Sequence, residues 1–301
     1  MTDIIFHHYD TSPFSELVRL AFGLKGLAWK SVQIPNVAPK PDLIPLTGGY
    51  RKTPVMQIGA NIYCDSAACI EALEVHTPLP SFYPQPLGRA GAILGAWAAG
   101  PMFMPSVSVA MGPIAHTIPA EFWEDRRKLF GLDTERFGSM GPHLKAQFEN
   151  SLARADDVLA DGRAFLGGDA ASYADFAFYM NLWFQKRFGP EPEVLKPFVH
   201  LDSWSARVAA IGHGERTEME ASEALAIAKA AVPSVTPEID PASGFSLGQA
   251  VTVRTEDPGA DRVAGTLVRL THRDIAILRQ DPAVGQVAVH FPRLGQIVSP
   301  A

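Results

Sequence analysis

The sequence predicts three parts in order: an α/β domain, an all-helical domain and a small β-barrel domain. The first part mixes alternating apolar runs with helical spacing, the second shows helical spacing alone, and the third returns to short alternating runs. Proline-rich stretches, which interrupt regular elements, separate the three parts. We therefore expect domains at residues 1–80, 87–232 and 242–301.

The first part begins with a β–α–β unit. An apolar strand at 3–9 precedes a helix at 15–24, which ends at Gly26, and a second strand follows at 29–34. The next segment is rich in proline and glycine, which predicts a winding connection. A hairpin and a helix N-capped near Asp65 complete this part; the predicted ranges are 53–58, 61–64 and 66–74.

The second part follows a proline-rich linker at 77–86. Apolar residues recur there with helical spacing and without comparable alternating strands. The predicted helices cover 87–99, 121–130, 140–159, 173–188 and 201–211.

The third part follows a second proline linker at 233–241. Its alternating runs at 250–254, 264–270, 274–278 and 286–291 predict a separate small β-barrel. About 60 residues form only a marginal core, so we expect the barrel to lean on the helical domain or on a second subunit. Mixed charges without a catalytic cluster favour a scaffolding role for it.

Composition restricts the function classes. The chain has 301 residues, of which 47% are hydrophobic and 19% charged, and these values exclude disorder. Its net charge of -6 lacks the basic excess that nucleic-acid binding requires. Cys64 and Cys69 cannot build a disulfide framework, and the N-terminus has no signal-peptide pattern. We expect a cytoplasmic protein without a nucleic-acid partner.

One charge-free stretch, residues 90–120, is long enough for a membrane span. It contains four prolines and interspersed glycine, serine and histidine, which suit a buried helix and an apolar loop better. We therefore expect no membrane association.

The loop at 11–15 carries small hydroxyls just before a predicted helix N-terminus. Free N–H groups and the helix dipole favour an anion at such a place, and a thiolate could be held there. The same residues also suit a simple cap, in which Ser12 or Ser15 accepts a backbone hydrogen bond and Pro13 begins the helix. This loop leaves both interpretations open.

Two further pairs suit binding of a peptide-like ligand. A cis bond between Thr53 and Pro54 would leave neighbouring backbone groups free to pair with an extended peptide. Asp65 and Ser66 lie at a strand-to-helix junction, where a carboxylate can face an α-amino group and a hydroxyl can face the matching carboxylate. Each pair alone is an ordinary feature.

In this order and at these spacings, the segments resemble the glutathione S-transferase family over about residues 1–230. The resemblance lies in Tyr-Asp-Thr-Ser-Pro-Phe-Ser-Glu-Leu-Val-Arg-Leu-Ala-Phe-Gly-Leu-Lys-Gly26, in Arg51-Lys-Thr-Pro-Val-Met-Gln-Ile-Gly-Ala-Asn-Ile-Tyr-Cys-Asp-Ser66 and in Ser172-Tyr-Ala-Asp-Phe-Ala177. The last segment matches a structural capping box of a core helix.

The resemblance implies a thioredoxin-like first domain and an enzyme that conjugates the thiol of glutathione to a small apolar electrophile in detoxification. Thr53-Pro54 would pair with the cysteinyl unit, and Asp65-Ser66 would hold the γ-glutamyl end. Glutathione is then the co-substrate, no metal is needed, and a homodimer is expected. The implied glutathione-binding residues are Phe14, Lys52, Thr53, Pro54, Asp65 and Ser66.

The thiol-activating residue is expected to be Ser12, because it opens the Ser-Pro-Phe loop and a hydroxyl donated to sulfur stabilises a thiolate. Ser15, Tyr9 and a backbone N–H are the alternatives, although strand parity could turn Tyr9 away. No cysteine occupies the loop, and Cys64 and Cys69 suit small core positions.

The second substrate should meet apolar walls. Candidates lie in the first helix and in the charge-free stretch, although such residues at this spacing also suit a core. They are Phe14, Trp97, Met102, Phe103 and Met104. The motif search gives no nucleotide or metal motif, and His7 and His8 point oppositely along a strand.

A second class of function stays open. A non-catalytic glutathione-binding or protein-interaction module would keep Pro54 and Asp65-Ser66 without useful turnover. Activity toward an aryl electrophile, measured beside glutathione affinity, separates this class from the enzyme.

Overall fold

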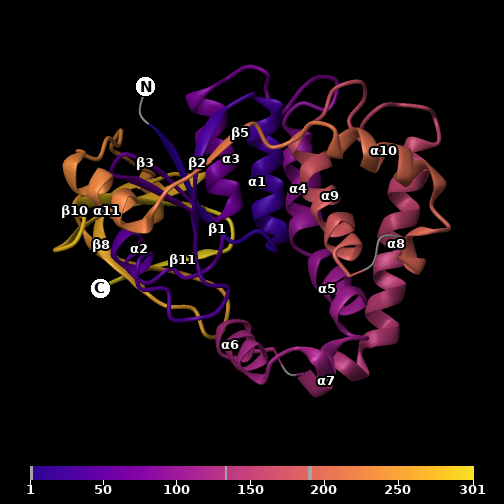
Figure 1. Cartoon of the computed structure of the whole chain (residues 1–301). Coiled ribbons are helices and arrows are strands. Elements are labelled where there is room, and N and C mark those ends of the chain that lie inside the picture. Colours follow the sequence, from indigo (N-terminus) through magenta and orange to yellow (C-terminus); the bar gives the residue numbers. More distant parts are fainter. Residues whose placement is uncertain (1–2, 133, 189–191) are drawn as a thin grey trace.

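The structure is a computed structural model that describes residues 3–132, 134–188 and 192–301 (Figure 1). Its first part is the predicted β–α–β unit with a hairpin and a helix. Parallel strands β1 and β2 flank helix α1, while β3 runs antiparallel to both β1 and β4. The elements are β1 (Ile4–His8), α1 (Pro13–Leu24), β2 (Ala28–Gln33), α2 (Ile44–Thr47), β3 (Val55–Ile58), β4 (Asn61–Cys64) and α3 (Ser66–His76).

Strand β1 lies at the centre of this part, and each of its five residues is buried. Phe6 points into the main core, where it meets Phe22 and Trp29 edge to face at 5.1 and 5.7 Å. Ile5 faces the other side of the sheet and joins a small cluster with Val32. Burial on both faces explains why residues 4–6 are all apolar rather than alternating, and the strand ends in the buried pair His7 and His8.

The helical part surrounds helix α9, of which twelve residues are buried. Ser172 and Asp175 form the predicted capping box, and Asp175 also accepts hydrogen bonds from the Leu166 backbone at 2.8 Å and from Trp204 Nε1 at 2.9 Å. The helices are α4 (Ala90–Ala99), α5 (Phe103–Met111), α6 (Ala120–Phe130), α7 (Thr134–Ser139), α8 (Gly141–Leu159), α9 (Tyr173–Lys186) and α10 (Val199–Ala209).

Residues 213–230, which the sequence analysis placed in the helical domain, return to the first part instead. Strand β5 (Glu215–Glu218) lies parallel to β2, and helix α11 (Ala221–Ala230) packs through Ala224 against Ile5 and Val32. All four residues of β5 are exposed. A fully exposed edge strand has no apolar alternation, so the sequence gives no sign of it.

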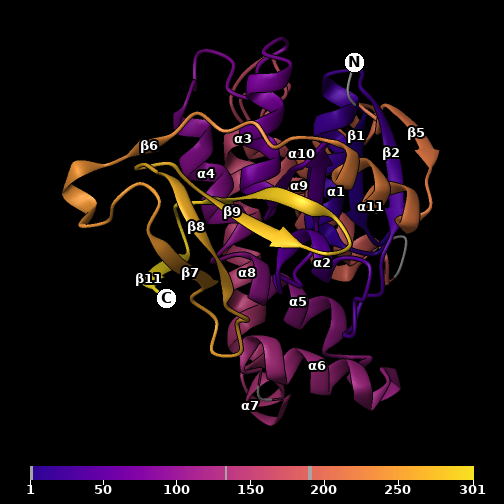
Figure 2. The ribbon, with the colours of Figure 1, turned by 90° about the vertical axis from the view of Figure 1, so that its left-hand side faces the viewer.

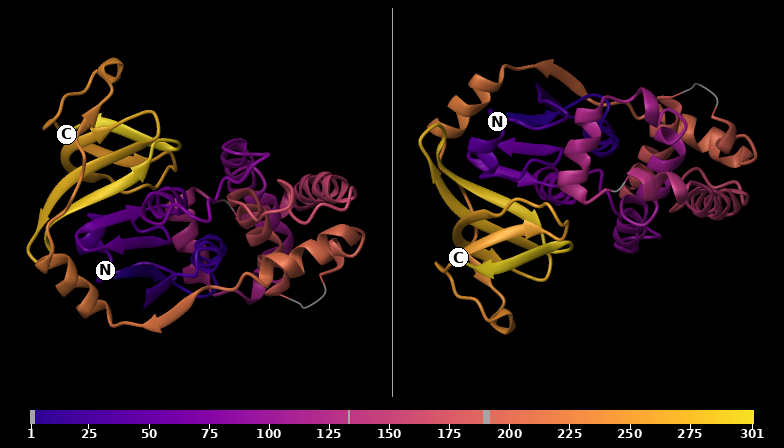
Figure 3. Two further views of the ribbon diagram at one scale, coloured as in Figure 1. Left: turned by 90° about the horizontal axis from the view of Figure 1, so that it is seen from above. Right: turned by 90° about the horizontal axis from the view of Figure 1, so that it is seen from below.

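The C-terminal strands are present as predicted, but they do not form a separate unit. Strand β10 lies parallel to β4, with Ala288 opposite Asn61, so the described strands form one sheet (Figures 2 and 3). Its order is β11-β7-β8-β9-β10-β4-β3-β1-β2-β5, and β6 pairs with β8. The strands are β6 (Glu238–Ile239), β7 (Ala250–Thr255), β8 (Val263–Leu270), β9 (Asp274–Asp281), β10 (Gly285–Pro292) and β11 (Gln296–Pro300).

A shared core joins the C-terminal strands to the first domain. Val55, Ile62 and Cys64 of the hairpin pack in one cluster with Val289 and Phe291 of β10. The prediction that the barrel stands apart is therefore corrected, because these strands extend the sheet of the first domain; they also contact the helical part, where Gly259 packs against Lys128 of α6.

The charge-free stretch forms α4 and α5. The run Ala90–Met111 is long and apolar enough to cross a membrane, and 33% of its most apolar window is buried. Length and composition of one such run are weak evidence for a span, because helices of soluble proteins pass the same test.

Candidate functional site

Ser12 caps helix α1. Its Oγ accepts a hydrogen bond from the backbone N–H of Ser15 at 3.2 Å, Pro13 follows within the first turn, and the residue is only 2% exposed. The cap uses an acceptor site of the oxygen, so the hydroxyl proton can still be donated. Ser15 is fully buried, and its Oγ has no hydrogen-bond partner among the described residues. Both candidate serines thus lie at the helix start, below the surface.

The Tyr9 side chain interacts with Ser12 of the capping loop, so strand parity does not turn it away from this loop. Burial raises the pKa of Tyr9, while hydrogen bonding to Ser12 and Arg126 and the charge of Arg126 oppose that rise. Lys40 Nζ lies 5.7 Å from the centre of the phenol ring. The phenol therefore stays protonated at neutral pH and can act as a hydrogen-bond donor.

The bond between Thr53 and Pro54 is cis and leads directly into β3. Lys40 Nζ donates to Thr53 Oγ1 at 2.9 Å. Burial, together with the charges of Arg126 and Arg51, lowers the pKa of Lys40 to about 8. The segment beside the proline is therefore held by a buried lysine that the sequence analysis did not identify.

Asp65 and Ser66 form the start of helix α3. Asp65 Oδ1 accepts from the backbone N–H of Ala67 at 2.9 Å, and Asp65 has φ of 90°, the one positive φ outside glycine in the described residues. Burial raises the pKa of Asp65, and the bond to Ala67 and the charge of Lys52 oppose this rise. Backbone strain of this kind persists where surrounding structure enforces it, often at ligand-binding positions.

Lys52 faces an acidic residue of the C-terminal strands. Its ammonium pairs with Asp257, from the loop between β7 and β8, and lies 5.2 Å from the centre of the Phe130 ring. Next to it, Arg51 pairs with Asp125 of α6 at 2.7 Å and with Asp261 of the same loop at 3.3 Å. Three parts of the chain thus meet beside the cis proline.

The predicted apolar pocket is brought together only in part. The rings of Phe14 and Phe103 lie 4.7 Å apart, so they can form one wall. Met102 is 1% exposed and fills the main core, where it offers almost no surface to a ligand. Trp97 is 38% exposed and stacks on Phe178 of α9, while Met104 is 39% exposed.

Both cysteines are core residues, as predicted. Cys64 and Cys69 are fully buried, and burial raises the pKa of each thiol well above its ordinary value. Within residues 3–132, 134–188 and 192–301, no group of three or more His, Cys, Asp or Glu side chains is placed to hold a metal ion.

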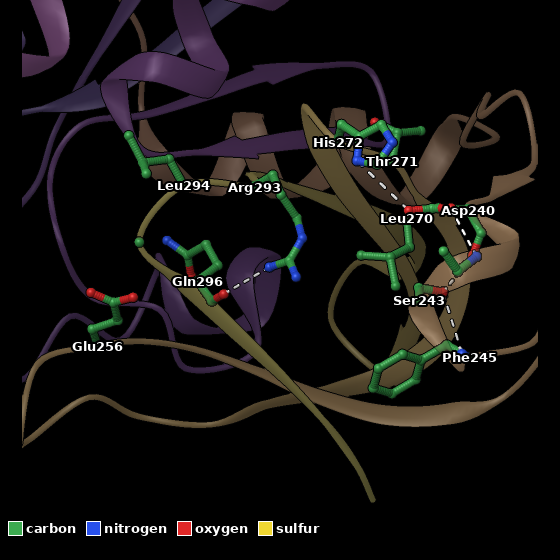
Figure 4. Close-up of a pocket in the computed structure, with 12 residues that line it drawn as sticks. Asp240, Ser243, Phe245, Glu256, Leu270, Thr271, His272, Arg293, Leu294 and Gln296 are labelled. Carbon is green, nitrogen blue, oxygen red and sulfur yellow. Dashed lines mark hydrogen bonds and ion pairs between the residues drawn. The ribbon is translucent and has the colours of Figure 1, made fainter. Parts of the chain in front are cut away.

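A separate cavity of about 660 Å³ lies among the C-terminal strands (Figure 4). Arg293 Nη1 donates to the Gln296 backbone carbonyl at 3.1 Å, and His272 lies 3.7 Å from Asp240. Glu256, which also lines the cavity, immediately precedes Asp257 in the chain. The cavity therefore adjoins the base of the loop that reaches Lys52.

Sequence reasoning missed the residues that surround the predicted site. Lys40 lies in the predicted winding connection, and Asp257 lies between two of the predicted C-terminal strands. Asp125 and Arg126 belong to a charged helix whose position over the site no local pattern reveals. Such contacts depend on how distant segments pack, so the sequence carried no specific signal for them.

Comparison with known proteins identifies relatives of this chain. Residues 6–81 match "Glutathione S-transferase, N-terminal domain", and residues 140–211 match "Glutathione S-transferase, C-terminal domain". A crystal structure of a GST-like protein from Pseudomonas syringae is 37% identical, covers 99% of this chain and 100% of its own, and superposes with a TM-score of 0.83. No curated protein matches the sequence.

Two more distant structures share the fold of the first two parts. A glutathione S-transferase from Rhodospirillum rubrum F11 is 22% identical, with a TM-score of 0.54, and covers 69% of this chain and 88% of its own. A Tau class glutathione S-transferase from mango, Mangifera indica, is 20% identical, with a TM-score of 0.51, and covers 69% of this chain and 89% of its own. Only the Pseudomonas structure among these three spans the C-terminal strands as well.

Proposed function

This chain belongs to the glutathione S-transferase family, and from that premise we propose that it binds glutathione and conjugates its thiol to a small apolar electrophile. The observation that carries the proposal is the grouping of Thr53-Pro54 with Asp65 and Ser66 at the start of α3, which the pairing of Val55 with Cys64 brings together. This grouping offers an extended backbone, a carboxylate and a hydroxyl to a ligand of peptide character.

In the proposed complex, the cysteinyl unit pairs with the backbone at Thr53-Pro54. The γ-glutamyl end lies at Asp65 and Ser66, where the carboxylate receives the α-ammonium group and the helix start receives the α-carboxylate. Lys52 supplies a positive charge at this end of the site. Phe14 and Phe103 then form an apolar wall beside the thiol.

The binding site is tested with Asp65→Ala. Loss of a charged hydrogen bond costs about 1.5–3 kcal/mol, which corresponds to roughly ten- to a hundredfold weaker binding. Calorimetry on the folded variant measures this change, and circular dichroism checks that α3 survives the loss of its cap. Unchanged affinity in a folded Asp65→Ala variant would refute the assignment.

We assign thiol activation to Ser12, whose hydroxyl can donate to sulfur and favour the thiolate. Ser12→Gly is the appropriate variant, because glycine replaces an N-cap serine at a cost of only a few tenths of a kcal/mol. We expect the pKa of bound glutathione, followed by thiolate absorbance, to rise. An unchanged midpoint with full turnover would transfer the role to Ser15, Tyr9 or a backbone N–H. Ser15→Ala and Tyr9→Phe test the two side chains, and the backbone N–H remains if neither variant shifts the midpoint.

The non-catalytic alternative keeps binding without turnover. Ser12 and Ser15 are both buried, so neither hydroxyl is openly exposed to a bound thiol, and this is the observation that favours the alternative. Conjugation of glutathione to a halogenated nitrobenzene, measured beside affinity, decides between the two. Binding without detectable conjugation of any aryl electrophile would support the binding module.

We further propose a cytoplasmic homodimer that acts in detoxification of electrophiles. Two buried, unpaired cysteines are compatible with a reducing compartment. The exposed apolar side chains of α4, Ile93 at 74% and Leu94 at 44%, supply a surface suited to a second copy. Light scattering measures the molecular mass, and a monomer at micromolar concentration would contradict the dimer.

A further inference from the structure

The loop between β7 and β8, residues 256–262, joins the C-terminal strands to the proposed glutathione site. Its Asp257 pairs with Lys52, and its Asp261 lies 3.3 Å from Arg51. These basic residues directly precede Thr53 and Pro54. Two ion pairs therefore connect one loop of the C-terminal strands to the segment on which the ligand is proposed to lie.

Close packing against α6 fixes the far side of this loop. A Cβ atom on Gly259 would lie 1.5 Å from the backbone oxygen of Lys128, so only glycine allows this approach. Pro258 lies over the end of the same helix, where a Cβ on Gly131 would meet it at 3.2 Å. The loop is thus held from two sides, which limits the positions open to Asp257.

The carboxylate of Asp257 is oriented and only partly occupied. Thr255 Oγ1 donates to Asp257 Oδ2 at 2.6 Å, and Lys52 binds the same oxygen. Both side-chain partners among the described residues thus use Oδ2, and the backbone N–H of Asp257 also interacts with the carboxylate. A carboxylate has about four acceptor sites, so it can still accept a donor from a ligand. The side chain is 26% exposed, so a ligand can reach it.

Charge balance shows which ligand group suits this place. Asp65 and Asp257 both interact electrostatically with Lys52, and the charge of Asp257 acts to raise the pKa of Asp65. Two carboxylates and one ammonium leave one negative charge uncompensated. The α-ammonium group of the ligand offsets this charge, while its α-carboxylate is received by the N–H groups at the start of α3.

We propose that Asp257 is a specificity-determining residue of the glutathione site, and that its carboxylate receives the α-ammonium group of the ligand together with Asp65. The C-terminal strands then have a part in ligand recognition and are more than a scaffold. This inference rests on the proposed function, because it assigns a role within the same site.

The test compares glutathione with its deamino analogue, in which the α-amino group is replaced by hydrogen. Calorimetry on the full-length protein gives the ratio of the two dissociation constants. The wild type should prefer glutathione by roughly ten- to a hundredfold, the usual effect of a charged hydrogen bond. Asp257→Asn should weaken the binding of glutathione more than that of the deamino analogue. The ratio of the two dissociation constants should therefore fall, and the preference that remains should come from Asp65.

The ratio of the two dissociation constants separates recognition of the ammonium group from other effects of the substitution. Release of Lys52 in Asp257→Asn would alter both ligands alike, because both retain their carboxylates. Asp261→Asn removes a charge from the same loop and should leave the ratio unchanged. Asp257→Glu keeps the charge, should retain part of the preference, and serves as the second variant if the asparagine substitution unfolds the loop.

Each outcome decides a separate question. No glutathione binding by the wild type would overturn the proposed function and, with it, the role of Asp257. Binding by the wild type with an unchanged ratio in Asp257→Asn would overturn the inference alone. Tighter glutathione binding in Asp257→Asn would also overturn it, because Asp257 would then block Lys52 rather than recognise the ligand.

Discussion

Mild acid should unfold this protein through histidines that the sheet keeps neutral. Burial lowers the pKa of His7 to about 4 and, with help from the charges of Arg19 and Arg216, that of His8 to about 3. Burial likewise lowers the pKa of His290 in β10 to about 4. The ordinary value, which applies to the unfolded chain, is 6.5.

The lowered histidine pKa values set the direction in which pH changes the free energy of unfolding. Between pH 6.5 and about 4 the unfolded chain binds protons that the folded chain does not, so the free energy of unfolding decreases as pH falls. At pH 5 the loss is about 2 kcal/mol for each histidine and about 6 kcal/mol for the three. That is comparable to the whole stability of an ordinary domain, about 5–15 kcal/mol.

Carboxylates contribute little to this window. The pKa values of Glu16 and Asp125 are lowered in the folded chain, so each carboxylate stabilises the fold at neutral pH. This stabilisation is lost only as the pH falls below the ordinary carboxylate pKa. Asp65 and Asp175 act in the opposite direction, because burial raises their pKa and the folded chain binds their protons more readily. The histidines therefore dominate between pH 6.5 and 5.

Urea unfolding at pH 7.5, 6.0 and 5.0 measures the effect. We expect the free energy of unfolding to fall steeply below pH 6.5, and His7→Gln to flatten the slope by about one proton. His272→Gln is the matched control, because the His272 side chain is 90% exposed. A free energy at pH 5 within about 1 kcal/mol of that at pH 7.5 would refute the reasoning.

Two further substitutions test buried contacts. Glu16→Ala removes the partner of Arg19 Nη2 at 2.7 Å, where both side chains are at most 4% exposed, and should cost about 3–5 kcal/mol of stability in urea unfolding. A loss below about 1 kcal/mol would mean that Arg19 finds water or another partner. Gly259→Ala should push the 256–262 loop from Lys128, cost about 1–3 kcal/mol, and weaken glutathione binding. Unchanged melting temperature and affinity would show that the loop relaxes freely.

Sequence patterns predicted the features that depend on neighbouring residues. Ser12, Asp65 and the Ser172–Asp175 pair all cap helices as expected, because capping is decided within a few residues. The thioredoxin-like and helical parts of the fold and the family resemblance are likewise confirmed. Local chemistry and element order were therefore available from the sequence.

Features that depend on distant packing were not available. The alternation of β10 predicted a strand but not its neighbour, and β4 lies 227 residues away in the chain, with Asn61 opposite Ala288. Met102 has the same apolar character as Phe103, yet one fills the core and the other meets Phe14. The pairing of Lys52 with Asp257 likewise joins two distant segments, and nothing in the sequence indicates that these two charges meet.

The junction between β4 and β10 has a consequence for synthesis. When the hairpin has left the ribosome, the outer edge of β4 has no partner until Pro292 has also been made. At about 5–20 residues per second, that interval lasts on the order of ten to fifty seconds. Throughout it, an unpaired and largely apolar strand is open to other chains. The nascent protein therefore exposes a strand edge to pairing with other chains for longer than its first domain alone would.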